Sequence, residues 1–131
     1  MKKENTDYLN KKFPYLYGYI RFFECGDGWF EIIYNLSKKI HEIDPHVQAT
    51  QVKEKFGGLR FYTNYESEEI SKVIREAELA ASKICEVCGT KENVTQNHLG
   101  WIKTLCDKCR ECRDKEKEEL WNVKIAEKKW E

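Results

Sequence analysis

The sequence CEVC at residues 85–88 is followed, seventeen residues later, by CDKC at residues 106–109. Two Cys-x-x-Cys pairs at this separation are typical of a zinc site with four thiolate ligands, because each pair can wrap one side of a tetrahedral ion. Gly89 directly follows the first pair, where a tight turn often needs a positive φ. The spacing therefore predicts a structural zinc ion bound by Cys85, Cys88, Cys106 and Cys109.

Two other interpretations of the six cysteines stay open at this point. Cys112 lies three residues after Cys109, so these two can also form the second pair. Alternatively, the cysteines are reduced and purely structural. A disulfide framework is disfavoured, because the chain shows no signal peptide and has few cysteines for its length. Cys25 is far from the others in sequence and is expected to be a small core residue.

Charge is dense but balanced, with 23 basic and 23 acidic side chains in 131 residues. Residues 1–82 carry 12 basic and 13 acidic side chains, and residues 83–131 carry 11 and 10. A protein that holds duplex nucleic acid through many phosphates usually has a basic excess, so this class is disfavoured. The chain has no transmembrane run, and we expect a soluble cytoplasmic protein without membrane contact.

The first part of the chain, residues 1–84, is expected to form an α+β domain. Residues 1–12 are polar and lysine-rich and are expected to be frayed. Residues 13–23 are rich in aromatic side chains but broken by Pro14 and Gly18, which favours an irregular segment. Gly26-Asp27-Gly28 is expected to be a turn, with Asp27 as the N-cap of a helix that ends at Asp44-Pro45.

A hairpin follows, with strands at 47–55 and 59–65 and a turn at 56–58. In the second strand, Leu59, Phe61 and Thr63 are expected to point to one face, and Arg60, Tyr62 and Asn64 to the other. Ser67 is expected to cap a helix that runs directly into the first cysteine pair. Residues 85–112 are expected to form a zinc ribbon, with strands at 94–97 and 101–105 and a turn at Leu99-Gly100. Residues 113–131 form a charged helix. The fold class is thus α+β: a small antiparallel sheet packed by two helices, then a zinc ribbon and a charged C-terminal helix.

Three cations of the predicted hairpin, at positions 53, 55 and 60, lie close to a pair of glycines. Backbone amides of a glycine turn can approach an anion, and arginine offers a planar fork for phosphate. Nearby aromatic rings can stack on a base. The alternative is ordinary hairpin chemistry with solvated lysines that protect an edge. The predicted ligand-binding residues are Trp29, Lys53, Lys55, Phe56, Gly57, Gly58, Arg60 and Tyr62.

An HNH nuclease is the enzyme that must be weighed, because Asn97-His98 lies between the two cysteine pairs. That chemistry needs a further metal-binding His or Asn in the following helix, but no histidine follows Cys109. The other two histidines, His41 and His46, are far away in sequence. The chain also lacks a Walker loop, a Rossmann fingerprint and a His-Glu-x-x-His motif, so we expect no enzyme.

Several blocks of the sequence occur together: FPYL at 13–16, GDGWF at 26–30, QVKEKFGGLRFY at 51–62 and CEVCG at 85–89, with Trp101 downstream. In these blocks the chain resembles a family of small bacteriophage and prophage proteins that has no agreed activity. The resemblance covers most of residues 13–109. It implies a role in DNA metabolism, regulation or countering host defence, in the host cytoplasm.

The sequence thus favours non-catalytic capture of a small anionic ligand, in particular a nucleotide. The phage resemblance extends this to sequestration of a host immune nucleotide signal. One alternative is a zinc-ribbon module that binds nucleic acid or regulates, because Lys103, Lys108, Arg110 and Arg113 gather near the second cysteine pair. Another is a protein that inhibits a host defence enzyme. The C-terminal helix could also support an oligomer.

Overall fold

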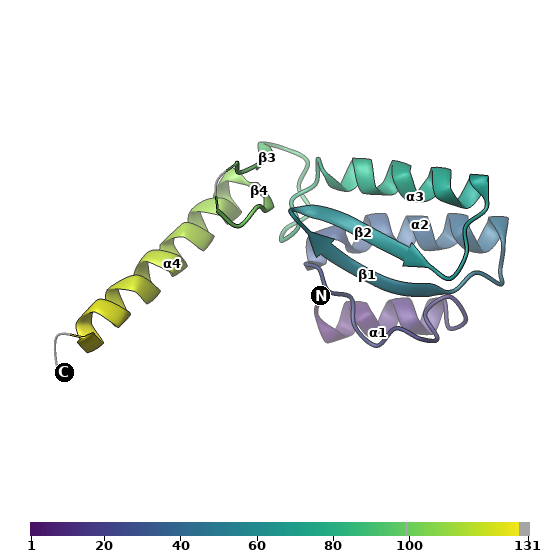
Figure 1. The fold of residues 1–131 in the computed structure, drawn as a ribbon, viewed down its shortest axis with the longest axis horizontal. Helices are drawn as coiled ribbons and strands as arrows, with labels where there is room; N and C mark the ends of the chain where they lie inside the picture. Colours follow the sequence, from purple (N-terminus) through teal and green to yellow (C-terminus); the bar gives the residue numbers. More distant parts are fainter. Residues whose placement is uncertain (99, 129–131) are drawn as a thin grey trace.

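The computed structural model describes residues 1–98 and 100–128, with side chains up to residue 123. The chain has an α+β fold with two small antiparallel sheets, as predicted (Figure 1). The elements in chain order are α1 (Lys3–Lys12), a 3₁₀ turn η1 (Asp27–Trp29), α2 (Phe30–Ile43), β1 (Ala49–Lys55), β2 (Gly58–Thr63), α3 (Glu68–Ala81), β3 (Val94–Gln96), β4 (Thr104–Cys106) and α4 (Asp107–Lys128).

The β1–β2 hairpin lies over α2 and α3 and buries one of its two faces (Figure 1). Val52 pairs with Phe61 on the inner face, and both are buried. Arg60 and Tyr62 alternate with buried Leu59 and Phe61, so they point to the outer face. This alternation was predicted from the sequence and is confirmed.

The N-terminal residues are ordered into α1, so the expectation of a frayed segment is wrong. Leu9 is completely buried in the main core, and Thr6 is buried as well. The helix α1 is mostly polar, and its main apolar contact with the core is made by Leu9. The sequence of residues 1–12 has no repeating apolar pattern, so periodicity did not predict this helix. Residues 13–23 are irregular, as expected, and bury the rings of Phe13, Tyr17 and Phe23 in the same core.

The two helix starts differ from each other in how they are capped. Ser67 accepts a hydrogen bond from the backbone N–H of Ile70 and caps α3 as predicted. Asp27 does not cap α2, which begins at Phe30 after the 3₁₀ turn. Its Oδ1 instead accepts hydrogen bonds from Lys2 N (2.8 Å) and Asn5 Nδ2 (3.0 Å), so Asp27 ties α1 to the domain.

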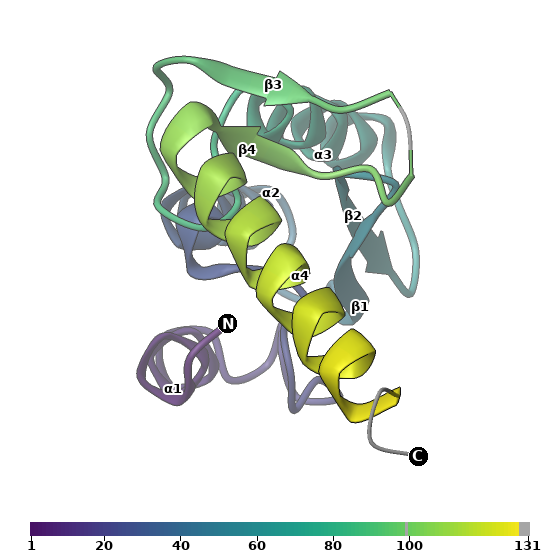
Figure 2. The same cartoon turned by 90° about the vertical axis from the view of Figure 1, so that its left-hand side faces the viewer.

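The cysteine-bearing element sits at one end of the domain, and α4 leads away from it (Figures 1 and 2). Strands β3 and β4 are shorter than the strands predicted for the ribbon. Their pairing extends only from Val94 opposite Cys106 to Gln96 opposite Thr104. Trp101 is not in a strand and is 71% exposed. The expected turn residue Leu99 lies outside the described residues, as do residues 129–131 of the charged helix.

Candidate functional site: a cysteine centre and the hairpin beside it

Four cysteines come together at the junction of α3, the ribbon and α4. Their Sγ atoms all lie within 4.8 Å of one another, and Cys88 Sγ is 3.7 Å from Cys106 Sγ. Tetrahedral zinc, with Zn–S bonds of about 2.3 Å, places its sulfurs about 3.8 Å apart. The geometry therefore fits one metal ion held by Cys85, Cys88, Cys106 and Cys109, while Cys112 is exposed and outside the group.

The environment of Cys85 favours a thiolate. Burial raises the pKa of this thiol, but hydrogen bonds from the backbone N–H groups of Cys88, Cys106 and Val87 outweigh burial and lower it to about 7. Burial and the neighbouring thiols raise the pKa of Cys109. Four thiols this close therefore cannot all ionise without a cation between them. A bound metal ion would supply that positive charge and stabilise the four thiolates.

The first cysteine pair docks into the turn Gly26–Trp29. Gly28 N donates to Glu86 O (2.7 Å), and Trp29 Nε1 donates to Ile84 O (3.0 Å). A Cβ on Gly28 would lie 2.1 Å from Cys85 O, so only glycine fits there. Trp29 is fully buried at this contact between the turn and the first cysteine pair. Its predicted place in the ligand site is therefore wrong: it holds the cysteine element.

The second cysteine pair docks on the tip of the hairpin through Lys103 and Thr104. Lys103 Nζ forms ion pairs with Glu54 Oε1 (3.1 Å) and Glu86 Oε1 (3.4 Å), and both carboxylates are almost fully buried. Thr104 Oγ1 donates to Gly57 O (2.6 Å). Gly57 itself is buried, and a Cβ there would meet Ile102 at 2.9 Å. The prediction that Gly57 receives an anion is wrong, because the ribbon covers it.

The hairpin turn has an unusual backbone that the cysteine element helps to hold. Phe56 has φ 52° and Gly57 has φ 80°, the left-handed pair of a type I′ turn. A bulky residue rarely adopts this conformation. Glu54 Oε2 accepts the Gly57 N–H (2.8 Å), which fixes the turn from inside. As a result the Phe56 ring is presented to solvent, with 69% of its surface exposed.

The outer face of the hairpin places two cations directly opposite each other. Lys53 pairs with Arg60 across the strands, and Gln51 pairs with Tyr62 beside them. Lys55 Nζ lies 5.6 Å from the centre of the Phe56 ring. Within the described part of the chain, Lys53, Lys55 and Arg60 form no ion pair. Like charges opposite each other are unfavourable in a hairpin, so this face is suited to an anion.

Two hollows flank Tyr62, which lines both of them. The first, of about 530 Å³, lies between β2 and α3 and includes Lys55, Phe56 and Arg60. The second, of about 670 Å³, lies between β1 and residues 19–24 and includes Lys53 and Arg21. Five of the eight predicted ligand residues are thus divided between the two hollows, whereas Trp29, Gly57 and Gly58 line neither. Sequence reasoning missed Tyr19, Arg21 and Phe22, because nothing local indicated that Glu24 bridges to Lys53 and brings this segment alongside β1.

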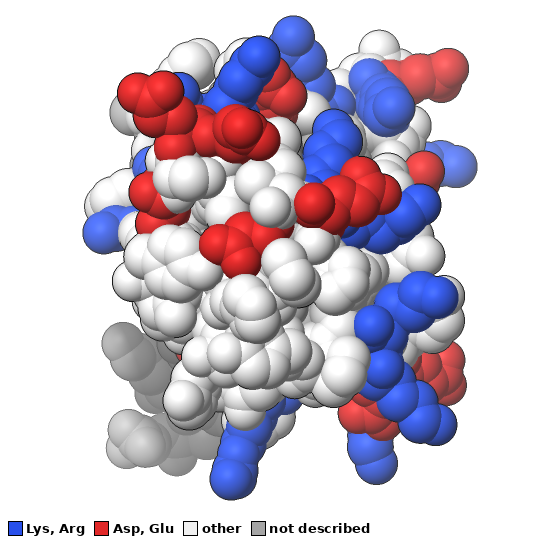
Figure 3. Space-filling view, turned by 90° about the vertical axis from the view of Figure 1, so that its right-hand side faces the viewer, with Lys and Arg blue, Asp and Glu red and all other residues white. Residues whose placement is uncertain are grey.

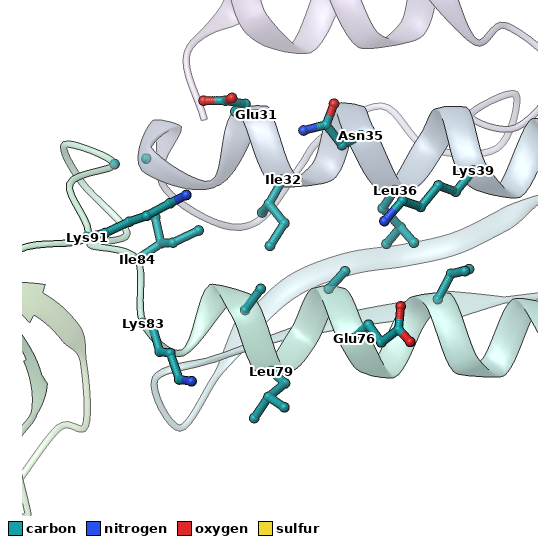
Figure 4. Close-up of a pocket in the computed structure, with 15 residues that line it drawn as sticks. Glu31, Ile32, Asn35, Leu36, Lys39, Glu76, Leu79, Lys83, Ile84 and Lys91 are labelled. Atoms are coloured by element: carbon teal, nitrogen blue, oxygen red, sulfur yellow. The ribbon is translucent and has the colours of Figure 1, made fainter.

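A third hollow, of about 740 Å³, lies between α2 and α3 (Figure 4). Ile32 and Leu36 point from α2 toward α3, while Leu79 points away (Figure 4). Its rim mixes both charge signs, with three lysines and two glutamates. This groove does not favour a ligand of one sign.

Charge is also mixed at the end of the domain away from the cysteines (Figure 3). Acidic side chains gather at the top of that view, around an uncharged centre. Tyr15 and Tyr65, each about half exposed, are held at this end by His46 and Asp44 after α2.

The polar residues of the ribbon are engaged in structural bonds. Asn97, which an HNH nuclease would use to orient a histidine, accepts hydrogen bonds from Lys103 N (2.8 Å) and Arg110 Nη1 (3.2 Å). Arg110 also donates to Thr95 O. Three of the four cations noted near the second cysteine pair therefore have partners within the protein: Lys103, Arg110 and, through an ion pair with Asp114, Arg113.

No family model matches the chain, and comparisons with curated proteins and with solved structures find no match either. Among the described residues, no helix combines the length and the apolar character needed to cross a membrane.

Proposed function

We propose that this protein is a non-catalytic binding protein that captures a nucleotide or a similar small anion on the outer face of the β1–β2 hairpin. One observation carries the proposal: Lys53 faces Arg60 across the strands with no ion-pair partner among the described residues, beside the half-exposed ring of Tyr62. A phosphate between the two cations would relieve their repulsion.

The aromatic rings supply the second part of the recognition. Tyr62 is 42% exposed and Phe56 is 69% exposed, and both line the hollow that contains Lys55 and Arg60. Stacking of a base on an aromatic ring contributes about 1–3 kcal/mol, and a hydrogen bond to a charged group contributes about 1.5–3 kcal/mol. A phosphorylated compound with a planar ring would use both features, whereas inorganic phosphate would use only one.

We further propose that the four cysteines bind zinc and that the metal is structural. Four thiolates close the coordination shell and leave no position for a reacting water. The zinc would keep Lys103 and Thr104 in place, and through them the turn that presents Phe56. Resemblance to phage proteins supports a biological role in which the captured nucleotide is a host immune signal, and this last step depends on the resemblance alone.

The proposal is tested by a thermal-shift screen of the zinc-loaded protein against mono-, di- and cyclic nucleotides and NAD-derived cyclic species. A ligand that binds only the folded state raises the melting temperature. Each ligand that does so is then titrated against the Lys55→Ala/Arg60→Ala variant. The matched control is Lys39→Ala/Lys83→Ala in the α2–α3 groove, which removes the same charge. We expect at least a tenfold loss of affinity in the first variant only. Equal affinities in both variants would refute the site.

Capture of a host protein is a second candidate, favoured by a separate observation. Leu120, Trp121 and Val123 of α4 are each more than half exposed, on a helix that leads away from the domain (Figure 1). A stoichiometric protein that co-purifies with the wild type, but not with a Leu120→Glu/Trp121→Glu variant, would support it. Equal recovery with both would contradict it.

A further inference from the structure

We infer that the hairpin face binds at least two consecutive nucleotides, so that it holds a single strand of nucleic acid more tightly than an isolated nucleotide. This inference rests on the proposed function and extends it. It comes from the second hollow, which continues the same surface on the other side of Tyr62.

Each hollow contains both features that a nucleotide needs. The hollow beside α3 combines Phe56 with Lys55 and Arg60. The hollow beside residues 19–24 combines two rings, Tyr19 and Phe22, with Arg21 and Lys53. Tyr19 and Phe22 are each 76% exposed, so neither ring is used by the core. Aromatic rings alternating with cations along one surface are the usual arrangement of single-strand binding sites.

Tyr62 forms the boundary between the two hollows and lines both. It stands on β2 next to Arg60, with Lys53 on the neighbouring strand. A base stacked on Tyr62 would therefore have a cation and a second aromatic ring on either side. A single nucleotide can fill one hollow, but only a linked pair or a longer strand reaches both.

The charge of the surface suits a strand with few phosphates in contact. The two hollows contain five cations and three carboxylates. One carboxylate, Glu24, accepts a hydrogen bond from Gln51 Nε2 (3.1 Å), and another, Glu78, accepts one from Phe61 N (3.1 Å). The balanced charge of the whole chain disfavours duplex binding through many phosphates. Single strands also gain affinity from each base that stacks on an aromatic ring, so they need fewer phosphate contacts.

The test uses the full zinc-loaded protein and three probes: thymidine monophosphate, a fluorescein-labelled single-stranded thymidine octanucleotide, and the same octanucleotide annealed to its complement. Affinities are measured by calorimetry for the mononucleotide and by fluorescence anisotropy for the others. An octauridylate replaces the octathymidylate in a parallel arm, to separate RNA from DNA. The variants are Arg21→Ala/Phe22→Ala in the second hollow and Lys55→Ala/Arg60→Ala in the first.

We expect the single strand to bind at least tenfold more tightly than the mononucleotide and than the duplex. Arg21→Ala/Phe22→Ala should weaken the single strand at least fivefold and change mononucleotide affinity less than twofold. Lys55→Ala/Arg60→Ala should weaken both. If the mononucleotide binds as tightly as the strand and Arg21→Ala/Phe22→Ala changes neither, the inference is wrong while the proposed function stands. If no probe binds but another nucleotide of the screen does, the inference is also wrong. If no nucleotide binds at all, both are wrong.

Discussion

Replacing Lys103 by methionine removes the ion pairs that join the cysteine element to the hairpin. The side chains of Glu54 and Glu86 are only 10% and 7% exposed, while Lys103 is 26% exposed. Each carboxylate would keep one backbone partner, Gly57 N or Gly26 N. Two nearly buried negative charges would nevertheless lose the cation between them.

The cost follows from the burial of these groups. Removing one partner of a buried ion pair costs about 3–5 kcal/mol, and the partial exposure of Lys103 places this case at the lower end, about 3 kcal/mol. For a chain of this size, 1 kcal/mol shifts the melting temperature by roughly 3–5 °C. Lys103→Met should therefore lower the melting temperature by about 10 °C.

The assay is thermal and denaturant unfolding at saturating zinc, followed by tryptophan fluorescence. Lys115→Met, at an exposed position of α4, is the matched control and should change the free energy of unfolding by less than about 0.5 kcal/mol. Adding Glu54→Gln and Glu86→Gln to Lys103→Met should recover part of the loss, because no buried charge is then unpaired. A melting temperature of Lys103→Met equal to that of the control would refute the argument.

Three further predictions concern the metal, the docking turn and a half-buried acid. Cys106→Ser should abolish zinc binding, measured by metal analysis, while Cys112→Ser leaves it unchanged; the reverse would overturn the ligand set. Gly28→Ala should lower both zinc content and stability, because its Cβ would lie 2.1 Å from Cys85 O, whereas Gly58→Ala, with its nearest contact at 3.5 Å, should be tolerated. Burial raises the pKa of the Glu78 carboxyl above its usual value. The contribution of Glu78 to stability is therefore fully present below the usual pKa, and it is lost as the pH rises through the raised pKa. Glu78→Gln should therefore melt higher than wild type at pH 8, with a smaller advantage near pH 5; a wild type that is more stable at pH 8 would contradict this.

Local patterns predicted the elements that depend on local physics. The alternation of Leu59, Arg60, Phe61 and Tyr62 gave the correct faces of β2, and Ser67 gave the start of α3. The four-cysteine group followed from spacing alone, because a tetrahedral site needs two close pairs.

Long-range docking could not be predicted from the sequence. Gly28 and Trp29 looked like a turn and a ligand-stacking ring, but their partners, Glu86 and Ile84, are more than fifty residues away. Asp27 had the pattern of an N-cap, yet a tertiary contact with α1 takes its carboxylate. The sequence predicts Gly57 in an anion site because the amides of a glycine turn can approach an anion. No local signal indicates that the ribbon covers this glycine.

The most direct test of hairpin-face binding is an amide chemical-shift titration of the ¹⁵N-labelled, zinc-loaded protein with a nucleotide ligand from the thermal-shift screen. The account predicts that the largest shifts fall on residues 51–63, with residues 19–24 joining when the ligand contains two or more linked nucleotides. Shifts confined to the α2–α3 groove or to the cysteine element would contradict it.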